Sequence, residues 1–227
     1  CTGFYTFDFA YYSSQSGYDM CIHVKPTDPN FVLLGGTNIY RSTDGFTTDN
    51  YKWIGGYQCD TLKPSNYVWP NQHPDQHQML FKPSNNNILY SVNDGGIFST
   101  QDINASIPVW QNLSKNHKST QFYTVAIEPG NTSSEIVVGG LQDNGTWFSP
   151  TKDESVDWKH VFYGDGAFCA ITRNRSNYYL SWQGGKTFKF EIQDDGTVDK
   201  LTRIDPTGGS GYQFINPFIL DPIDDNR

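Results

Sequence analysis

The feature that most constrains this chain is a pattern of four short segments that recurs four times. Each copy begins with an apolar segment that ends near a proline, at 21–26, 79–83 and 125–129. The fourth copy, at 168–173, lacks the proline. A polar turn, a second apolar segment, a glycine-rich turn, a third segment and a variable loop follow in each copy. The glycine-rich turns are expected at 35–36, 94–96, 139–140 and 184–185. A repeat of this kind indicates that one structural unit is built several times.

The fourth segment of each copy centres on a large apolar residue at a nearly constant distance from the start. Trp53, Trp110 and Trp158 follow the prolines by 27, 27 and 29 residues, and Leu201 takes this place in the fourth copy. Four short strands per unit, at a period of about 45–50 residues, are typical of β-propeller blades. A β-sandwich or a solenoid is the alternative. The joint recurrence of strand order, turn chemistry and tryptophan spacing favours the propeller.

Composition supports an all-β chain and argues against other classes. Glycine, asparagine, threonine, serine and tyrosine are abundant, which favours short strands and turns over helices. Aromatic residues make up 15% of the chain, whereas disordered chains are poor in them. The net charge of −8 argues against nucleic acid as a partner. No transmembrane segment is predicted, because no apolar run approaches the roughly 18 residues that a membrane helix needs.

The repeat divides the 227 residues into four blades and two partial blades, all predicted to belong to one propeller domain. The blades are expected at 21–72, 73–120, 121–163 and 164–213. Residues 1–20, with a strand at 5–9, are interpreted as the end of a preceding blade, and 214–227 as the first strand of a further blade. We therefore expect a fragment of a larger propeller. The remainder of the propeller, or a covering partner chain, would protect its open sheet edges.

The cysteines are even in number, which permits disulfides in a secreted protein. Cys21 and Cys169 occupy nearly equivalent positions three blades apart, too far apart to bond in a propeller. The pairs Cys1–Cys21 and Cys21–Cys59 are both open.

One loop between a third and a fourth segment carries a recognisable motif. Residues 41–48 read Arg-Ser-Thr-Asp-Gly-Phe-Thr-Thr and resemble the Asp-box of bacterial-neuraminidase-repeat (BNR) propellers, with Ser42, Asp44 and Gly45 at the motif positions. The aromatic residue that closes the box is displaced to Trp53, and the related loop at 99–102 is degenerate. The carboxylate of such a turn accepts backbone N–H bonds and fixes the hairpin. We therefore assign the box a structural role.

Further motifs follow one another in a set order. They are His-Pro-Asp-Gln-His at 73–77, Asn-Asp-Gly-Gly-Ile at 93–97, Gln-Phe-Tyr at 121–123, Gly-Leu-Gln-Asp-Asn-Gly-Thr at 140–146 and Gly-Asp-Gly at 164–166. This order resembles the BNR or sortilin-like propeller regions of large secreted proteins of Bacteroidetes, many carried by the type IX secretion system. It also distantly resembles two-propeller endoglucanases that cleave xyloglucan. The resemblance covers about 18–222 and implies a propeller fold and a secreted or cell-surface location.

Propeller topology places most of these motifs on one face. Connections from a fourth to a first strand share that face with turns from a second to a third strand, whereas the Asp-box lies on the other face. Loops on a rigid scaffold are the usual place for binding. Loop 17–19 and Asn93 share this face with the predicted ligand-binding residues, which are His73, Asp75, His77, Gln142, Asn144, Tyr123, Trp182 and Gln183.

Three aspartates on the same face, Asp94, Asp143 and Asp165, are the candidate catalytic residues. Glycoside hydrolysis needs a general acid and a base or nucleophile, which are two carboxyls about 5–10 Å apart. Asp-Gly and Asp-Asn-Gly are also what tight turns require, and this structural role is the alternative for each residue.

Histidines and aromatic residues on this face also have two interpretations. His73, Asp75 and His77 have the chemistry of metal ligands, but hydrogen bonds to neighbouring blades explain the same pattern. No metal and no other cofactor is predicted. Aromatic rings can stack on sugars or pack between sheets, and the residues concerned are Tyr18, Phe122, Tyr123, Trp147, Tyr163 and Trp182.

These patterns predict a recognition module, associated with carbohydrate, that binds a glycan or peptide on this face. An endo-acting glycoside hydrolase with paired aspartates is one alternative, and a protein–protein scaffold of the sortilin type is another. Sialidases clamp a carboxylate with three arginines. The chain has five arginines and none maps to the candidate face, which argues against a sialidase despite the BNR resemblance.

Overall fold

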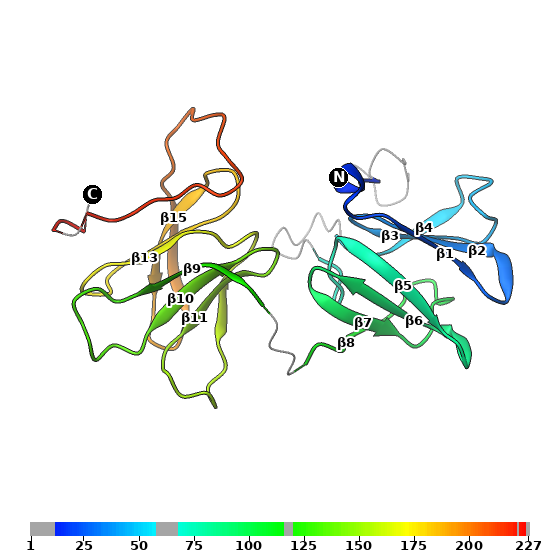
Figure 1. Ribbon diagram of the computed structural model, residues 1–227, viewed down its shortest axis with the longest axis horizontal. Helices are drawn as coiled ribbons and strands as arrows, with labels where there is room; N and C mark the ends of the chain where they lie inside the picture. Colours follow the sequence, from blue (N-terminus) through cyan, green and yellow to red (C-terminus); the bar gives the residue numbers. More distant parts are fainter. Residues whose placement is uncertain (1–11, 58–67, 116–119, 222, 226–227) are drawn as a thin grey trace. The chain divides into compact units, whose positions relative to one another are not determined.

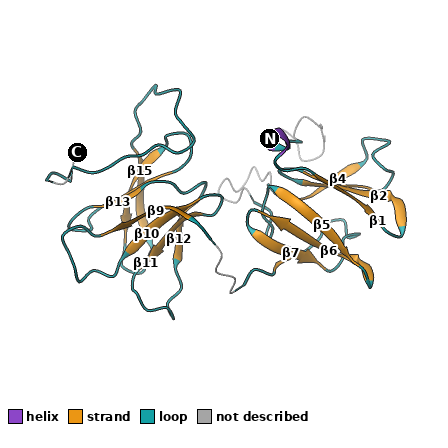
Figure 2. Ribbon diagram, in the orientation of Figure 1, coloured by secondary structure: helices purple, strands orange, loops and turns teal. Residues whose placement is uncertain are grey.

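A computed structural model describes residues 12–57, 68–115, 120–221 and 223–225. Short strands and turns make up nearly all of this part of the chain, as Figure 2 shows, with one 3₁₀ turn, η2, at Gln15–Gly17. Within these ranges no helix has the length and apolar character needed to cross a membrane. The protein is therefore an all-β structure, as the composition predicts.

The strands form four antiparallel sheets of four strands each, and within each sheet the strands pair in chain order. This order is the blade pattern predicted from the repeat, and it confirms the fold class. The strands are β1 (Cys21–Lys25), β2 (Asp28–Gly35), β3 (Ile39–Ser42) and β4 (Tyr51–Gly55); β5 (Gln76–Lys82), β6 (Asn85–Asn93), β7 (Gly96–Thr100) and β8 (Trp110–Asn112); β9 (Phe122–Ile127), β10 (Val137–Leu141), β11 (Gly145–Ser149) and β12 (Lys159–Phe162); β13 (Cys169–Ile171), β14 (Tyr178–Ser181), β15 (Thr187–Ile192) and β16 (Val198–Arg203).

The chain divides into two compact units, 1–117 and 118–227 (Figure 1). Unit 1 holds the sheets β1–β4 and β5–β8, and unit 2 holds β9–β12 and β13–β16. The single propeller domain expected from the repeat stays a prediction. The expected strand at 5–9 lies outside the described residues.

In unit 1 the core forms where alternating apolar side chains of the two sheets meet. On β5, Met79 and Phe81 are buried while Leu80 between them is 59% exposed, which is the period-two pattern of a strand with one covered face. The two sheets are joined by a hydrogen bond as well as by apolar packing. The indole nitrogen of Trp110 donates to the carbonyl of Ile54 at 2.8 Å. The core consists of Cys21, Phe31, Leu33, Ile39, Ile54, Met79, Phe81, Leu89, Phe98, Ile103 and Trp110.

A buried arginine adds a second link between the two sheets of unit 1. Arg41 of β3 donates from its guanidinium to the carbonyls of Ile103 and Ala105, which precede β8. Its side chain is almost fully buried, and burial lowers the pKa of the guanidinium. Arg41 therefore joins the first blade to the loop of the second.

Unit 2 has an aromatic core and a close approach of backbones. The core is formed by Ile136, Val138, Phe148, Phe162, Ile171, Tyr178, Leu180, Phe188, Phe190 and Ile192. Gly139 and Gly140, expected in a turn, lie inside β10, and the turn follows at 142–144. A Cβ on Gly140 would lie 2.2 Å from the carbonyl oxygen of Ala167. The glycine is needed because the sheet β9–β12 meets the segment before β13 there.

The segment 214–221 differs from its prediction. It was expected to form the first strand of a further blade, but it has no strand pairing in the described structure. A strand exists only when its N–H and C=O groups meet a neighbour. An apolar run such as Phe218–Leu220 carries the side-chain pattern of a strand without supplying that neighbour.

The two described cysteines are isolated thiols. Cys21 is buried in the core of unit 1, and Cys169 opens β13 in unit 2. Burial raises the pKa of Cys21 to about 11 and that of Cys169 to about 12. Cys1 and Cys59, the predicted partners of Cys21, lie outside the described residues.

Candidate functional site

The loops chosen from the sequence lie at one end of each sheet. In a sheet whose strands pair in chain order, the connection into the first strand and the turn between the second and third strands share an end. We define the unit-1 loop cluster as Tyr18, Asp19, His73, Asp75, His77, Asn93 and Asp94. We define the unit-2 loop cluster as Tyr123, Gln142, Asp143, Asn144, Trp147, His160, Tyr163, Asp165, Trp182 and Gln183.

His77 is the centre of the unit-1 loop cluster. It lies near the start of β5, and its Nε2 is hydrogen-bonded to the carboxylate of Asp94, in the turn between β6 and β7. Its Nδ1 lies 3.9 Å from Oδ1 of Asp19. The ring of Tyr18 meets the imidazole edge-on, with centroids 5.1 Å apart. The imidazole therefore stands between two carboxylates from two different connections.

Asp19 is fully buried, and its Oδ1 faces Nδ1 of His77. Burial is the main reason that its pKa is raised, and the charge of Asp94 raises it further. His77, and after it the nearby carboxyl of Asp75, lower it. Loop 17–19 was predicted to share the candidate face, but the sequence assigned Asp19 no role. Its position beside Tyr18 in a connection into a first strand was the available signal.

His73, Asp75 and His77, which have the chemistry of metal ligands, do not come together as one set. His77 is engaged by Asp94 and Asp19. His73 packs against Gly95, and its Nδ1 contacts the carbonyl oxygen of its own neighbour, Pro74, at 3.1 Å. A strand would place alternate residues such as these three on one face, but Asp75 has a φ of +64° and precedes β5.

Asp75 is held in place by the 3₁₀ turn. It is almost fully buried, and the side-chain amide of Gln15 donates to its Oδ1 at 2.8 Å. One oxygen of Asp75 and one of Asp94 lie within 4.8 Å of each other. Unit 1 therefore gathers three carboxylates around one imidazole.

In the unit-2 loop cluster, Asp165 links two loops. Its Oδ1 accepts the backbone N–H of Asp143 at 3.0 Å, and its own N–H donates to Oε1 of Gln183 at 3.1 Å. Asp143 has a φ of +60°, which suits a tight turn. Asp165 therefore stabilises a turn, which is the structural role that the sequence allowed for each of the three aspartates.

A row of rings lies beside these carboxylates. Trp147 and His160 have ring centroids 5.1 Å apart, and those of His160 and Tyr163 are 4.5 Å apart. Tyr163 is 65% exposed, and the indole of Trp147 donates to the carbonyl of Asn144 at 2.7 Å. His160 was missed from the sequence because it alternates with the apolar residues of a fourth strand and belongs to no motif.

Tyr123 adds a polar aromatic group to the same cluster. Its hydroxyl is hydrogen-bonded to the side-chain carbonyl of Gln142. Burial raises the pKa of Tyr123, and the charges of Asp165 and Asp143 raise it further. The hydroxyl therefore lies in the electrostatic field of both aspartates.

Trp182 has a packing role. Its ring stacks on Phe162 with centroids 5.0 Å apart and an angle of 5° between the planes, and Phe188 meets it edge-on at 5.2 Å. The ammonium of Lys186 lies 5.2 Å from the ring centroid. Of the two uses that the sequence left open for this ring, packing between sheets is the one that the contacts support.

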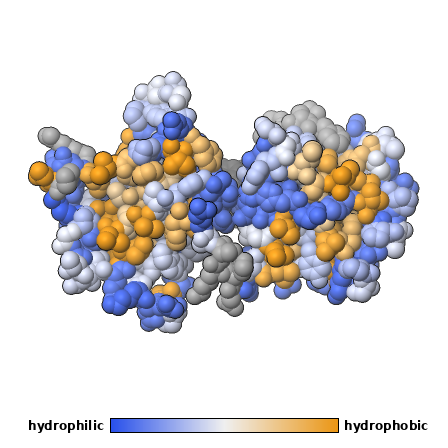
Figure 3. Space-filling model, viewed as in Figure 1, coloured by the Kyte–Doolittle hydropathy of each residue, from blue (hydrophilic) through white to orange (hydrophobic). Residues whose placement is uncertain are grey.

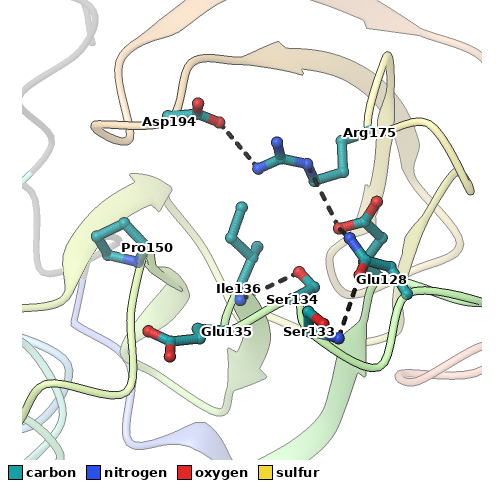
Figure 4. A pocket seen from close by; sticks show the side chains of 9 residues that line it. Glu128, Ser133, Ser134, Glu135, Ile136, Pro150, Arg175 and Asp194 are labelled. Carbon is teal, nitrogen blue, oxygen red and sulfur yellow. Dashed lines mark hydrogen bonds and ion pairs between the residues drawn. The ribbon is translucent and has the colours of Figure 1, made fainter.

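The opposite end of unit 2 contains a polar pocket of about 340 Å³ (Figure 4). Its lining comes from turns that were interpreted as structural. Arg175 points between two acids there, with Nε 3.4 Å from Glu128 and NH1 2.9 Å from Asp194. Arg175 therefore links the segment after β9 to the turn between β15 and β16.

The Asp-box has the structural role predicted for it. Ser42 is buried at the end of β3, and its hydroxyl lies 2.6 Å from Oδ1 of Asp44 and accepts the N–H of Phe46 at 2.8 Å. Thr48 also donates to the Asp44 carboxylate. The hydroxyl of Ser42, and after it that of Thr48, lower the pKa of Asp44. Gly45 supplies the positive φ of the turn, at +69°.

The described arginines have partners within their own units. Arg41 binds carbonyls, Arg173 pairs with Asp225, Arg175 lies in the pocket, and Arg203 pairs with Asp205. In the part of the chain that the structure describes, no three arginines meet as a carboxylate clamp would require.

The chain is similar to solved structures, one of which is described here. No family model and no curated protein matches the chain. A GH74 enzyme of Niastella koreensis matches with 15% sequence identity and a TM-score of 0.33, over 80% of this chain and 34% of the enzyme chain. The chain thus spans about a third of the length of that structure.

Proposed function

We propose that this chain is a secreted or cell-surface recognition module, built of propeller-like blades, that binds carbohydrate at the unit-2 loop cluster. The observation that carries the proposal is the row Trp147–His160–Tyr163, whose outermost ring is 65% exposed. The amides and carboxylates of Gln142, Asp143 and Asp165 belong to the same cluster.

The chemistry of a sugar matches this combination. A pyranose ring has an apolar face that an exposed aromatic ring can cover, and hydroxyls at its rim that planar polar groups can bind. Tyr163 supplies the exposed ring. Hydrogen bonds hold the polar groups in place, one between Gln142 and Tyr123 and one between Asp165 and Gln183. These groups would therefore lose little conformational entropy when a ligand binds.

The test is binding of the whole chain to a panel of soluble polysaccharides, measured by affinity electrophoresis and calorimetry. Tyr163→Ala should weaken binding at least tenfold. Leu201→Ala is the matched control, because Leu201 is also half exposed but lies within β16, away from the cluster. Equal loss in both variants, or no binding to any polysaccharide, would refute the proposal.

A hydrolase is the second candidate, because the backbone N–H of Asp143 donates to the Asp165 carboxylate at 3.0 Å, which holds the two aspartates in one cluster. In this alternative an endo-acting glycoside hydrolase uses two carboxyls as acid and base or nucleophile. The test is release of reducing ends from the bound polysaccharide. Asp143→Asn should abolish turnover and keep binding if the chain is a hydrolase, and there should be no turnover to lose if it is a binding module.

We also propose that the remainder of a propeller ring or a partner chain covers part of the surface. Both units show apolar surface in Figure 3, and first strands carry exposed apolar side chains such as Ile22 in β1 and Ile127 in β9. Light scattering should detect self-association of the isolated chain that falls when Ile22→Ser and Ile127→Ser are combined. A monomeric wild-type chain would contradict this part of the proposal. The extracellular location rests on the BNR-like motif order and is tested by fractionation of the source cells.

A further inference from the structure

The pocket at the end of unit 2 opposite the unit-2 loop cluster is a cavity to which the sequence assigned no function. It has a volume of about 340 Å³, and small-molecule sites span about 300–1,000 Å³. Connections of both sheets of unit 2 enclose it: the turn after β9, the loop after β11, the turn between β13 and β14 and the turn between β15 and β16. Seven of its nine lining residues are polar. The pocket therefore has the size of a ligand site and a lining suited to a polar ligand.

Arg175 is the fixed centre of the pocket. Its Nε lies 3.4 Å from Glu128 and its NH1 lies 2.9 Å from Asp194, and Figure 4 shows the guanidinium between the two acids. Glu128 is buried and also accepts from the side-chain amide of Asn131 at 3.1 Å. Arg175 has a φ of +55°, a conformation that is uncommon outside glycine and is found more often at ligand-binding sites. These polar groups are therefore held in place before a ligand binds, which lowers the entropy cost of binding.

The charges of the lining disfavour ionic ligands. Three carboxylates and one guanidinium line the pocket. Arg175 pairs with two of the carboxylates, and the third, Glu135, pairs at 2.7 Å with Lys152, which is not part of the lining. An anion would meet the excess of negative charge, and a cation would compete with Arg175 and Lys152 for carboxylates that are already paired. The lining therefore favours an uncharged ligand.

The hydrogen-bonding groups of the lining match a molecule rich in hydroxyls. A hydroxyl donates one hydrogen bond and accepts others, so neighbouring hydroxyls can meet a carboxylate and a guanidinium at the same time. The side chain of Asp194 is 83% exposed and Ser133 is exposed, so both are accessible to a ligand. Pro150 adds a small apolar surface for C–H groups. A purely apolar ligand would leave the polar groups of the lining unpaired.

We propose that this pocket binds a single neutral monosaccharide, with Arg175 as a hydrogen-bond donor and Asp194 as an acceptor. A volume near the lower end of the range for small-molecule sites suits one sugar ring rather than a chain. The site does not rest on the carbohydrate proposal for the unit-2 loop cluster, because it lies at the other end of the sheets and takes one sugar unit. The competing explanation is that the ion pairs of Arg175 only join two blades.

The experiment uses the whole chain and saturation-transfer difference NMR with glucose, galactose, mannose, xylose and arabinose, followed by calorimetry. We expect saturable binding of at least one of these sugars. Galacturonate and glucosamine, an anionic and a cationic analogue, should bind at least tenfold more weakly. Asp194→Ala should weaken binding at least tenfold, and Ser133→Trp, which fills the pocket, should abolish it. Glu154→Ala is the matched control, because it removes an exposed carboxylate between β11 and β12 that is not part of the lining.

Three results would overturn the proposal: no binding of any of the five sugars at tens of millimolar, unchanged affinity in Asp194→Ala or Ser133→Trp, or tighter binding of either charged analogue. If Ser133→Trp does not fold, Asp194→Ala decides the question, because that side chain is 83% exposed. Tyr163→Ala separates this site from the unit-2 loop cluster. It should lose polysaccharide binding and keep monosaccharide binding, whereas loss of both would assign the sugar to the loop cluster and refute the pocket.

Discussion

The close approach of backbones in unit 2 predicts that Gly140→Ala is strongly destabilising. The new Cβ would lie 2.2 Å from the oxygen and 2.6 Å from the nitrogen of Ala167, whereas real Cβ contacts are not found under 3.0 Å. The backbone at Ala167 would have to retreat by at least about 0.8 Å. It is tied on both sides, because its oxygen accepts from Thr124 at 2.9 Å and the N–H of Gly166 donates to Leu141 at 2.9 Å.

The magnitude follows from these contacts. Overpacking a well-filled interior costs about 1–3 kcal/mol or more. Weakening two buried hydrogen bonds adds about 0.5–1.5 kcal/mol each. The lower backbone entropy of alanine in the unfolded chain offsets about 0.5–1 kcal/mol. We therefore expect a net loss of about 3 kcal/mol, a large part of the 5–15 kcal/mol by which domains are typically stable.

Urea unfolding followed by near-UV circular dichroism measures this loss. Gly139→Ala is the matched control on the same strand, because its Cβ would meet the ring of Phe122 at 2.5 Å, and that ring is 36% exposed and can turn away. It should cost less than about 1 kcal/mol. A Gly140→Ala protein within about 0.5 kcal/mol of wild type, or a Gly139→Ala protein equally damaged, would refute the reasoning. Glycan binding should fall with Gly140→Ala, since the displaced segment carries Asp165.

Three further predictions concern the Asp-box, the thiols and the link between the sheets of unit 1. The pKa of Asp44 is lowered in the folded state, so its stabilising effect is complete above the unfolded pKa and is lost as the pH falls through the folded pKa. Asp44→Asn should therefore lower the thermal midpoint at pH 7, and the difference from wild type should shrink towards pH 3; a constant difference would contradict this. Cys21 and Cys169, with pKa values of about 11 and 12, should resist iodoacetamide at pH 8 until urea unfolds the chain, as mass spectrometry can show. Rapid labelling of the native protein would disprove that burial. Trp110→Phe removes a buried bond between two sheets and should cost about 1–3 kcal/mol in urea unfolding, whereas an unchanged midpoint would show that the bond is not needed.

The blade pattern could be predicted from sequence because strand formation is local. Alternation on β5, the tryptophan that opens β8 and the glycine turn after β2 depend on residues within a few positions of one another. The Asp-box could be predicted for the same reason, since Ser42 and Asp44 are two residues apart. The prediction of a turn failed for Gly139 and Gly140. A glycine pair is favoured both in a turn and in a strand that another backbone approaches closely, and the sequence does not distinguish the two.

The candidate site was predictable as a face and not as a set of contacts. Strand order alone places Asp94, Asp143 and Asp165 at the ends of sheets that carry the connections into first strands. The partner of each residue depends on which loops meet across blades. The sequence therefore paired His77 with His73, whereas the structure pairs it with Asp94 and Asp19.

The sequence by itself determined the repeat, the four-stranded sheets and the ends at which polar loops collect, because these follow from period, turn chemistry and strand direction. Only the tertiary structure decided which rings pack and which stay exposed. Trp182 was a predicted ligand-binding residue and Tyr163 was not, yet Trp182 stacks on Phe162 and Tyr163 is 65% exposed. The tertiary structure also showed that Asp19 is buried beside His77. Burial depends on all the neighbours that folding brings together, and no local pattern contains them.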